Sequence, residues 1–401
     1  MRGSWRIGRI AGIEIAIHYT WLLALFVFTW LVGQGFRTTY PGWHSYLYWI
    51  AGFLATFTLF LSVLIHELAH SLVARARGLA VSSITLFILG GVSNLAEEPE
   101  KPGTEFMMAV VGPLASLVLG ILFWISWYLI TKTWVLPIFS VKIAANKQTL
   151  ALAIIGFLAY VNIILTIFNL LPGFPLDGGR VLRSIIWGTT GDLSKATNIA
   201  TIIGRIFGWA FIALGVWLAL FIQGGLLNGI WFIFIGWFLN SAADNGRREA
   251  TLREHLTGVL VGQIMQRNIE SVHPDTNVAD LVQTIFIQKN KRAIPVTEGE
   301  NLVGIVTLSD IKDLPQEKWQ TTLVSQVMNR GTLYTVKPDE DLGRVLRLSA
   351  EHNLNQIPVM SQWKLVGMIT RADVINYLHL SQELNIKGIR KSGTSDAEVK
   401  S

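Results

Sequence analysis

The chain has 401 residues, of which 51% are hydrophobic and only 15% are charged. Soluble domains carry about 25% charged residues, so the composition indicates a protein that crosses a membrane several times. The formal net charge of +6 is modest and its arginines lie beside apolar runs, so we expect no nucleic-acid partner. There is no cysteine, which excludes disulfides and thiolate ligands and leaves His, Asp and Glu to hold any metal.

Six apolar runs are long enough to cross a bilayer as helices. They cover residues 15–34, 46–73, 105–130, 149–171, 201–222 and 226–243. The first run has no small-residue cleavage site after it, so we expect a retained span and not a removed signal peptide. The arginine clusters fall on one side if the spans alternate in direction. The positive-inside rule then predicts an integral multi-pass protein with both termini cytoplasmic. The expected location is a prokaryotic plasma membrane.

The segment VSSITLFILGGVSNL, residues 81–95, lies between the second and third runs. It is too short to span a bilayer and too apolar for a free loop, and its β-branched residues favour strands. Backbone groups at membrane depth must be hydrogen-bonded within the protein. We therefore predict a strand or β-hairpin embedded in the membrane against the spans.

The last 150 or so residues are polar enough for a soluble domain and contain an internal repeat. VGQIM from Val261 recurs as VSQVM from Val324, and LVGIVTLSD from Leu302 recurs as LVGMITRAD from Leu365, each 63 residues later. Each copy has a helix-like segment before two short strands, which predicts a pair of α/β units. The expected parts are a membrane domain at 1–246, a linker at 247–260, the two copies at 261–316 and 317–382, and a flexible tail at 383–401.

The end of the second run reads HELAH, from His66 to His70. On a helix, two histidines four residues apart project from the same face, where both can bind one Zn²⁺. Glu67 can then act as general base toward a water that the metal activates. The alternative is a set of polar residues at a membrane interface, but it does not explain the full pattern at a depth where ionisable groups are costly.

Asp177 is the candidate for a third protein ligand, since two imidazoles and a water leave one tetrahedral position open. It lies in NLLPGFPLDGGR, directly after the fourth run. Pro172 and Pro175 stop the helix there, and Gly178 and Gly179 permit a turn that aims the carboxylate at the second span. An ordinary turn at a span end is the alternative, but an even topology places Asp177 at the depth of the HELAH motif.

Asn169 begins the same motif, inside the end of the fourth run. Its amide could donate a hydrogen bond to an oxyanion or to an extended substrate backbone. A hydrogen bond between two helices would explain its position nearly as well.

Together these motifs resemble the site-2 protease family of intramembrane zinc metalloproteases, in the subgroup that carries paired CBS domains. The resemblance rests on HELAH, the GGV of the hairpin, GPLAS in the third span, NLLPGFPLDGG and the repeat, and it covers nearly the whole chain. Gly112 and Pro113 match the family's Gly-Pro pair, which is expected to pack closely against the catalytic spans. The residues implied for the site are His66, His70 and Asp177 as ligands of one Zn²⁺, Glu67 as catalytic base and Asn169 as active-site asparagine.

The resemblance also implies the partners. Family substrates are membrane-anchored regulators with a single span, such as anti-sigma factors, or remnant signal peptides. A helical span hides its carbonyls in its own hydrogen bonds, so its cleavage requires local unwinding at helix-weakening residues. The segment at 81–95 could hold the unwound chain as an added strand.

The GIVTLSD and GMITRAD stretches resemble CBS domains, whose tandem pairs bind adenine nucleotides. The resemblance places Thr307 with Asp310, and Thr370 with Asp373, at the ribose hydroxyls of ATP, AMP or another adenosyl ligand. The alternative is that each pair caps the following helix. The apolar helices of the tail are expected to form a homodimer.

Two other classes of function remain open from the sequence. One is a CBS-regulated membrane transporter that uses the His/Asp cluster as an ion site, and the other is a non-catalytic scaffold. Glu67 separates them from a protease, because hydrolysis needs a general base and ion transport does not.

Overall fold

The structure is a computed structural model that describes residues 3–88, 90–95, 99–135, 149–256, 258–289, 291–299, 301–331 and 333–384. It divides into two compact units, Met1–Arg248 and Glu249–Ser401, each of which is described by itself. The tail expected at 383–401 lies outside the described residues from 385 onward. The finer domain limits drawn from the sequence remain predictions.

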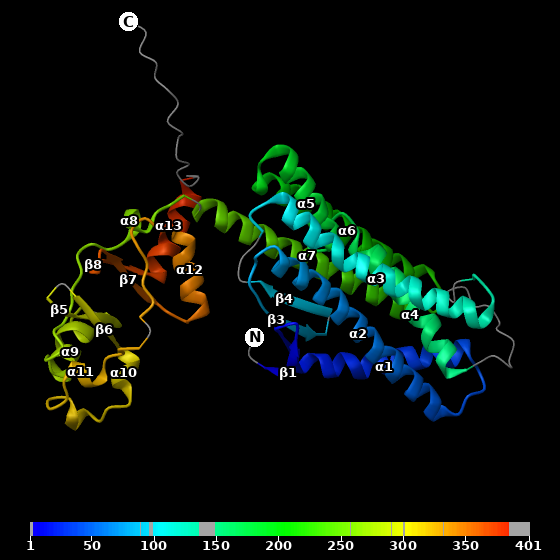
Figure 1. Ribbon diagram of the computed structural model, residues 1–401, viewed down its shortest axis with the longest axis horizontal. Coiled ribbons are helices and arrows are strands. Elements are labelled where there is room, and N and C mark those ends of the chain that lie inside the picture. Colours follow the sequence, from blue (N-terminus) through cyan, green and yellow to red (C-terminus); the bar gives the residue numbers. More distant parts are fainter. Residues whose placement is uncertain are drawn as a thin grey trace, which may run out of the picture. The chain divides into compact units, whose positions relative to one another are not determined.

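Six helices in the described part of the first unit are long and apolar enough to cross a membrane, as the sequence predicted (Figure 1). They are α1 (Tyr19–Thr39), α2 (Ser45–Ala76), α3 (Pro102–Thr131), α4 (Leu150–Asn169), α6 (Leu193–Phe221) and the first part of α7 (Leu226–Leu256). Large apolar side chains face outward, as in Leu220, which is 72% exposed, whereas Asn162 and Thr166 are buried inside. Apolar surfaces and polar interiors suit a protein surrounded by lipid.

Four strands form one sheet in the order β1-β2-β3-β4. The strands are β1 (Ser4–Ile10), β2 (Ile13–His18), β3 (Val81–Phe87) and β4 (Gly90–Leu95). β3 and β4 are the antiparallel hairpin expected at 81–95, and β2 adds to β3 in parallel, with Ile15 opposite Ile84. We expected the first span to begin near residue 15, but residues 13–18 are extended. Ile13 and Ile15 are buried against Ile84, and such a β-branched cluster favours a strand.

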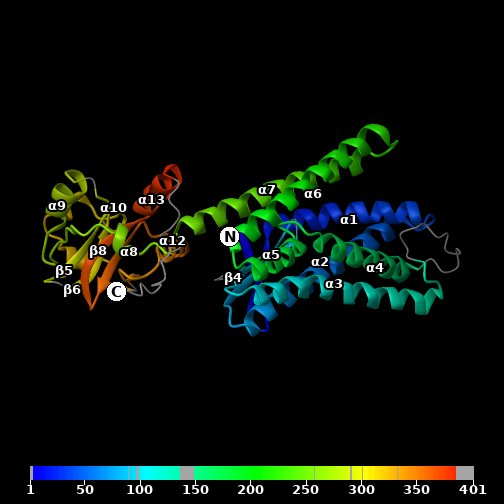
Figure 2. The same cartoon turned by 90° about the horizontal axis from the view of Figure 1, so that it is seen from above.

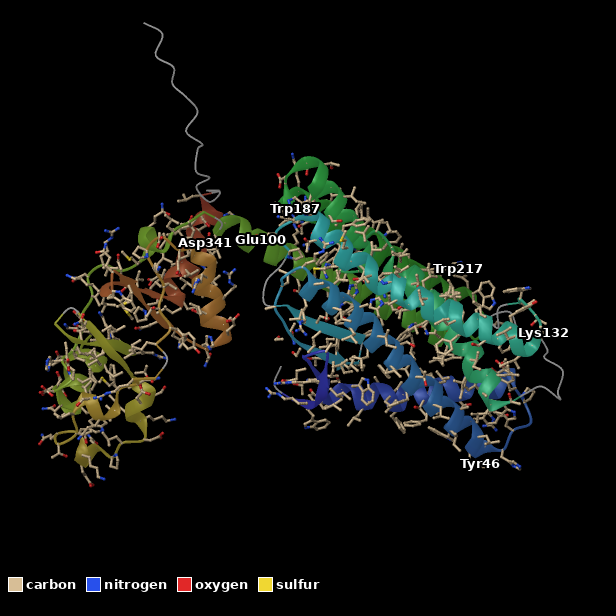
Figure 3. All side chains as sticks on the ribbon, viewed as in Figure 1. Tyr46, Glu100, Lys132, Trp187, Trp217 and Asp341 are labelled. Carbon is tan, nitrogen blue, oxygen red and sulfur yellow. The ribbon has the colours of Figure 1, made fainter. Side chains whose placement is uncertain are left out.

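The sheet shows which helix ends lie together. β2 leads directly into α1 and β3 follows α2, so the start of α1 and the end of α2 lie at the same end of the unit. Trp187 lies at this end, whereas Tyr46 and Lys132 lie at the opposite end (Figure 3). The HELAH motif is therefore near the end of the unit that carries the sheet.

A short helix that the sequence analysis did not predict, α5 (Asp177–Thr190), follows the loop after α4. We expected Gly178 and Gly179 to permit a turn, but both are helical and lie in the first turn of α5. A Cβ atom at Gly178 would collide with the carbonyl oxygen of Leu170, and one at Gly179 would collide with the backbone of Gly173. Glycine is needed because the start of α5 packs directly on the loop backbone.

The helices α6 and α7 lie side by side (Figure 2). A Cβ atom added to Gly215 of α6 would lie 2.6 Å from the carbonyl oxygen of Gly229 of α7, and one added to Gly236 of α7 would meet the backbone of Gly208 and Ile212. Small residues at a helix crossing allow this close approach within a membrane.

The second unit contains one copy of the repeat in each half. Its sheet has the order β5-β6-β8-β7, with β5 (Ala293–Glu298) and β6 (Asn301–Thr307) from the first copy and β7 (Gln356–Ser361) and β8 (Lys364–Thr370) from the second. The helices are α8 (Val261–Ile264), α9 (Val278–Leu281) with a π-helix at Val282–Ile287, α10 (Leu308–Lys312), a 3₁₀ turn at Gln316–Lys318, α11 (Val324–Val327), α12 (Leu342–Glu351) and α13 (Arg371–Glu383).

The two copies exchange their first segments. Val261 is fully buried in the core of the second copy, and its N–H donates to the carbonyl oxygen of Glu340 at 2.9 Å. The equivalent Val324 is fully buried in the core of the first copy, and its N–H donates to Thr276 at 2.8 Å. This reciprocity makes the pair pseudo-symmetric, as the repeat predicted.

Candidate metal centre

The structure brings together the three residues that the sequence analysis predicted as ligands. His66 and His70 are 5% and 7% exposed and lie one turn apart on α2, and Asp177 opens α5. The two Nε2 atoms are 3.1 Å apart, and Asp177 Oδ2 lies 3.1 Å from His66 Nε2 and 3.2 Å from His70 Nε2. Among the described residues, His66, His70 and Asp177 lie close enough together to hold a metal ion.

The hydrogen bonds of the histidines show that this group fits zinc. His70 Nδ1 lies 2.5 Å from the carbonyl oxygen of Met108, which can only accept, so Nδ1 carries a proton and Nε2 is the nitrogen that can bind a metal. Nε2 of both histidines and Asp177 Oδ2 point at one another, so one ion between them could contact all three. Two imidazoles with a carboxylate are a common zinc ligand set.

One stripe of α3 supports both histidines. Met108, Gly112 and Ser116 are four residues apart and so share a face of the helix. Ser116 Oγ lies 2.9 Å from His66 Nδ1. A Cβ atom at Gly112 would lie 2.7 Å from His66 Nε2 and nearer still to His70, so Gly112 packs closely against the HELAH helix, as expected. Sequence analysis missed Ser116, although its spacing from the Gly-Pro pair in GPLAS was a usable signal.

Glu67 points at strand β4. Its Oε2 accepts a hydrogen bond of 3.0 Å from Ser93 Oγ, and Ser71 Oγ donates to Ser93 Oγ at 3.1 Å. Neither serine was identified from the sequence, because nothing in GGVSN or HELAHS indicates that the two segments meet.

Asn169 is the last residue of α4 and is half-buried. Its side chain has no hydrogen-bond partner among the described residues, so the helix-to-helix hydrogen bond considered above is not found there. The loop of residues 170–176 separates it from Asp177, the first residue of α5.

Helix α5 is anchored by an ion pair that the sequence analysis also missed. Glu105, near the start of α3, is 1% exposed and accepts from Arg183 Nε at 2.6 Å. Arg180 Nε lies 3.8 Å from the same carboxylate oxygen. Both arginines belong to the helix that begins with Asp177, so Glu105 fixes the element that carries the third candidate ligand.

In the second unit, the Thr-x-x-Asp pairs cap helices. The N–H and hydroxyl of Thr307 both donate to Asp310 Oδ2 at 2.7 Å, and those of Thr370 donate to Asp373 Oδ2 at 2.8 Å. The capping role considered as the alternative is therefore present at both pairs. Asp373 differs from Asp310 because it also accepts from Gln266 Nε2 at 3.0 Å.

A cleft of about 590 Å³ lies between the two copies of the repeat. Its cationic lining consists of Lys291, Arg292 and Arg371, and Thr370 also lines it, whereas Thr307 does not. Lys289 donates to Glu270 at 2.7 Å and holds the pKa of that carboxyl below its ordinary value, so an ionised Glu270 also lines the cleft. The cleft thus places Thr370 of one Thr-Asp pair on the same lining as three positive charges and the carboxylate of Glu270.

Comparisons with known proteins agree with this architecture. The family model of peptidase family M50 matches residues 54–213, and that of the CBS domain matches residues 261–317 and 324–380. Rip3 of Mycobacterium tuberculosis is 33% identical over 378 residues, which cover 93% of this chain and 92% of that protein. The zinc metalloprotease MJ0392 of Methanocaldococcus jannaschii is 30% identical over 388 residues, covering 96% and 99%.

Among solved structures, the site-2 protease from Methanocaldococcus jannaschii is similar with a TM-score of 0.40 and 29% identity, covering 61% of this chain and 95% of that one. The full-length identity to Rip3 and the two family models establish the relationship. The chain therefore belongs to peptidase family M50, the site-2 proteases, as an integral membrane zinc metalloprotease with a tandem pair of CBS domains.

Proposed function

We propose that the chain is an intramembrane endopeptidase that hydrolyses a peptide bond within or near the span of a membrane-anchored regulatory protein. His66, His70 and Asp177 hold one zinc ion, and Glu67 is the general base. The observation that carries this proposal is the convergence of three ligand atoms within 3.2 Å of one another. Two belong to the buried face of the membrane-length helix α2, which also carries Glu67, and the third belongs to α5.

The chemistry follows from the positions of these side chains. When bound, zinc supplies a Lewis acid that polarises the scissile carbonyl and lowers the pKa of water toward neutrality. Glu67 takes a proton from the attacking water and gives it to the leaving amine. Asn169, whose amide is uncommitted among the described residues, donates to the substrate backbone.

Edge strand β4 is the surface on which we place the substrate. β4 ends the sheet, so no strand among the described residues pairs with one side of its backbone, and the same strand contacts Glu67. An unwound substrate segment can add to such an edge through main-chain hydrogen bonds.

A photo-crosslinking amino acid at Val92 of β4 should capture a substrate peptide, and one at Ile7 of the opposite edge strand β1 should not. Equal capture at both positions would remove this part of the proposal.

The activity test compares wild type with Glu67→Gln. The probe is a synthetic single-span peptide in detergent micelles, with an Asn-Gly pair at mid-span and a fluorophore and quencher at its ends. Both proteins should bind zinc, and only wild type should cleave the peptide, whereas His66→Ala should lose zinc as well. Equal cleavage by Glu67→Gln would overturn the protease proposal and leave the cluster as the ion site of a CBS-regulated transporter or scaffold.

We place the sheet end of the first unit, both termini and the CBS domains in the cytoplasm of a prokaryotic cell. Arg75, Arg180 and Arg247 support this orientation, because they lie near span ends that share one side in an alternating topology. The chain has no cysteine, so a single introduced thiol is diagnostic. In intact cells, a membrane-impermeant thiol reagent should label Lys132→Cys and leave Ser4→Cys unlabelled. The reverse pattern would invert the topology.

The second unit supports regulation by an adenine nucleotide. A cleft of this size can hold a small ligand, and Lys291, Arg292 and Arg371 supply the charge that phosphate groups require. A carboxylate such as Asp373 can accept hydrogen bonds from ribose hydroxyls. Calorimetric titration of the full-length protein with ATP, AMP and S-adenosylmethionine tests this. Silence with all three would leave the pair as an association module only.

A second copy of the chain is the other partner that we propose. Ile375 and Leu380 of α13 are 39% and 56% exposed, which supports an apolar contact between two CBS pairs. The mass of the detergent-solubilised protein by light scattering should be that of a dimer, and a Leu380→Glu variant should be monomeric. A wild-type monomer at micromolar concentration would contradict this.

A further inference from the structure

Two residues of β4 contact Glu67 directly. Ser93 Oγ donates to Glu67 Oε2 at 3.0 Å, and a Cβ atom at Gly91 would collide with Glu67 Cγ. Positions 91 and 93 are two apart in a strand, so both face the same side of the sheet. This face of β4 is therefore shaped around the side chain of Glu67, with a hydroxyl at position 93 and no side chain at position 91, where Glu67 Cγ lies.

The direction of the hydroxyl protons follows from the types of atom involved. A carboxylate oxygen can only accept, so Ser93 must use its single O–H proton on Glu67. Ser93 can then only accept from Ser71, whose Oγ lies 3.1 Å away. Ser71 is fully buried and lies four residues after Glu67 on the same face of α2. The three groups form a chain of two hydrogen bonds that begins and ends on α2.

These two hydrogen bonds leave one carboxylate oxygen of Glu67 available. No described residue forms a hydrogen bond with Glu67 Oε1, whereas Oε2 is held by Ser93. Fixing one oxygen of a carboxylate restricts rotation of the group and directs the other oxygen to one place. A general base acts efficiently when it is held within hydrogen-bond reach of the proton that it removes.

We propose that Ser93 is a positioning residue for hydrolysis, which holds Glu67 so that Oε1 faces the attacking water, and that Ser71 fixes the Ser93 hydroxyl in its donor direction. This inference rests on the proposed function, because it assigns Glu67 the role of base. Ser93 lies on the strand to which we add the substrate. A substrate segment bound along β4 therefore orders the strand that also holds the base.

The test compares Ser93→Thr with Ser93→Val. The two side chains have the same shape and the same preference for strands, and differ by one hydroxyl. On the single-span probe peptide, Ser93→Val should lower kcat by about tenfold or more with KM unchanged, as expected for loss of a supporting hydrogen bond, and Ser93→Thr should stay near wild type. Ser71→Ala should cause a smaller fall in kcat.

Two further measurements separate positioning from damage. Zinc dissociation to a competing chelator should have the same rate in Ser93→Val as in wild type, because Ser93 contacts no candidate ligand. Ser45→Ala is the control, since Ser45 is an exposed serine at the opposite end of α2 from Glu67, and its kcat should be unchanged.

Equal kcat values for the Thr and Val variants would overturn the inference, as would a common rise in KM or in zinc loss. Glu67→Gln distinguishes this failure from failure of the proposed function. If Glu67→Gln is inactive while Ser93→Val is fully active, the protease assignment stands and only the role of Ser93 is wrong. If Glu67→Gln is active, the assignment itself is wrong.

Discussion

The imidazoles of His66 and His70 are each held by a hydrogen bond at Nδ1, independently of any metal. Ser116 and the carbonyl oxygen of Met108 are the partners, and both belong to α3. Each bond fixes the ring plane and directs Nε2 toward Asp177, so the ligand atoms are preorganised for the ion. The contribution of each partner can be measured separately from catalysis, because it affects metal affinity.

Replacing Ser116 with alanine should weaken zinc binding by about 10-fold, as expected for loss of a partner that orients a ligand. Competition with a chromogenic chelator measures this. Ser126→Ala is the control, because Ser126 is an exposed serine on the same helix that donates to the carbonyl oxygen of Leu122. Equal zinc affinity in both variants would show that Ser116 does not orient His66.

Gly112→Ala should damage the same site by steric overlap. The added methyl group would displace both imidazoles, and overpacking of this kind costs about 1–3 kcal/mol. We expect lower zinc content and little activity from a protein that still inserts into the membrane. Gly103→Ala is the matched control on α3, since a Cβ atom there meets nothing within 4 Å. Full zinc content in Gly112→Ala would contradict the close packing.

The sequence identified the candidate site only in part, and the reason is physical. His66, Glu67 and His70 share a short motif whose spacing matches one helical turn, so their joint role can be predicted locally. Ser93 and Ser116 are polar residues of common types, and their importance arises only when distant elements pack together. Sequence spacing along one chain segment contains no information on such contacts.

At the scale of elements, α5 carries Asp177 and its position depends on charge. The helix has one apolar side and two arginines that reach Glu105 on α3, and Arg183 also lies over the ring of Phe174 at 5.6 Å. A buried carboxylate is costly unless it is paired. The ion pair therefore ties the third candidate ligand to the helix that orients the two histidines.

Glu105→Gln should destabilise the protein by about 3–5 kcal/mol, because it leaves the guanidinium of Arg183 buried without its counter-charge. Thermal unfolding in detergent measures the loss, and zinc content should fall with it. Asp244→Asn is the control, since its ion pair with Arg205 is exposed, and its effect should stay below about 1 kcal/mol. Similar melting temperatures for the two variants would contradict an anchoring role.

Elements with a strong local pattern were predictable, and those built from long-range contacts were not. The six spans follow from apolar length, and the hairpin of β3 and β4 follows from its composition. β2 was assigned to the first span because IEIAIH is apolar, and its pairing with β3 is formed across two intervening helices. α5 was missed because the prolines before it and the glycines after Asp177 suggested a turn. Those glycines are helical and allow the first turn of α5 to pack on backbone.

At the scale of the whole molecule, the two copies of the repeat share a fold and differ in the residues that follow the second strand. Arg371 of the second copy is equivalent to Leu308 of the first, and Arg371 lines the cleft. The repeat was readable from the sequence, but the cleft was not, because it requires the reciprocal packing of both copies.

Arg371→Leu therefore places at position 371 the leucine that the first copy has at position 308. We expect ATP affinity, measured by calorimetry on the full-length protein, to fall by about tenfold or more through loss of a charge-assisted hydrogen bond. The two aspartates provide a comparison. Asp373→Asn should lower ATP affinity more than Asp310→Asn, because Asp373 also accepts a hydrogen bond from Gln266 and Asp310 does not. Unchanged ATP binding in Arg371→Leu would exclude phosphate recognition by this residue.

The parallel pairing of β2 with β3 also has a consequence for biosynthesis. The strands flank α1 and α2, so they can meet only after both helices have been synthesised and have crossed the bilayer in opposite directions. β2 is synthesised first, and β3, the strand that pairs with it in parallel, is synthesised about 70 residues later. A chain whose first helix inserted the wrong way round would leave β2 and β3 on opposite sides, with unpaired edges. The complete sheet can therefore form only when both helices have inserted in opposite directions, and β4 with Ser93 belongs to that sheet.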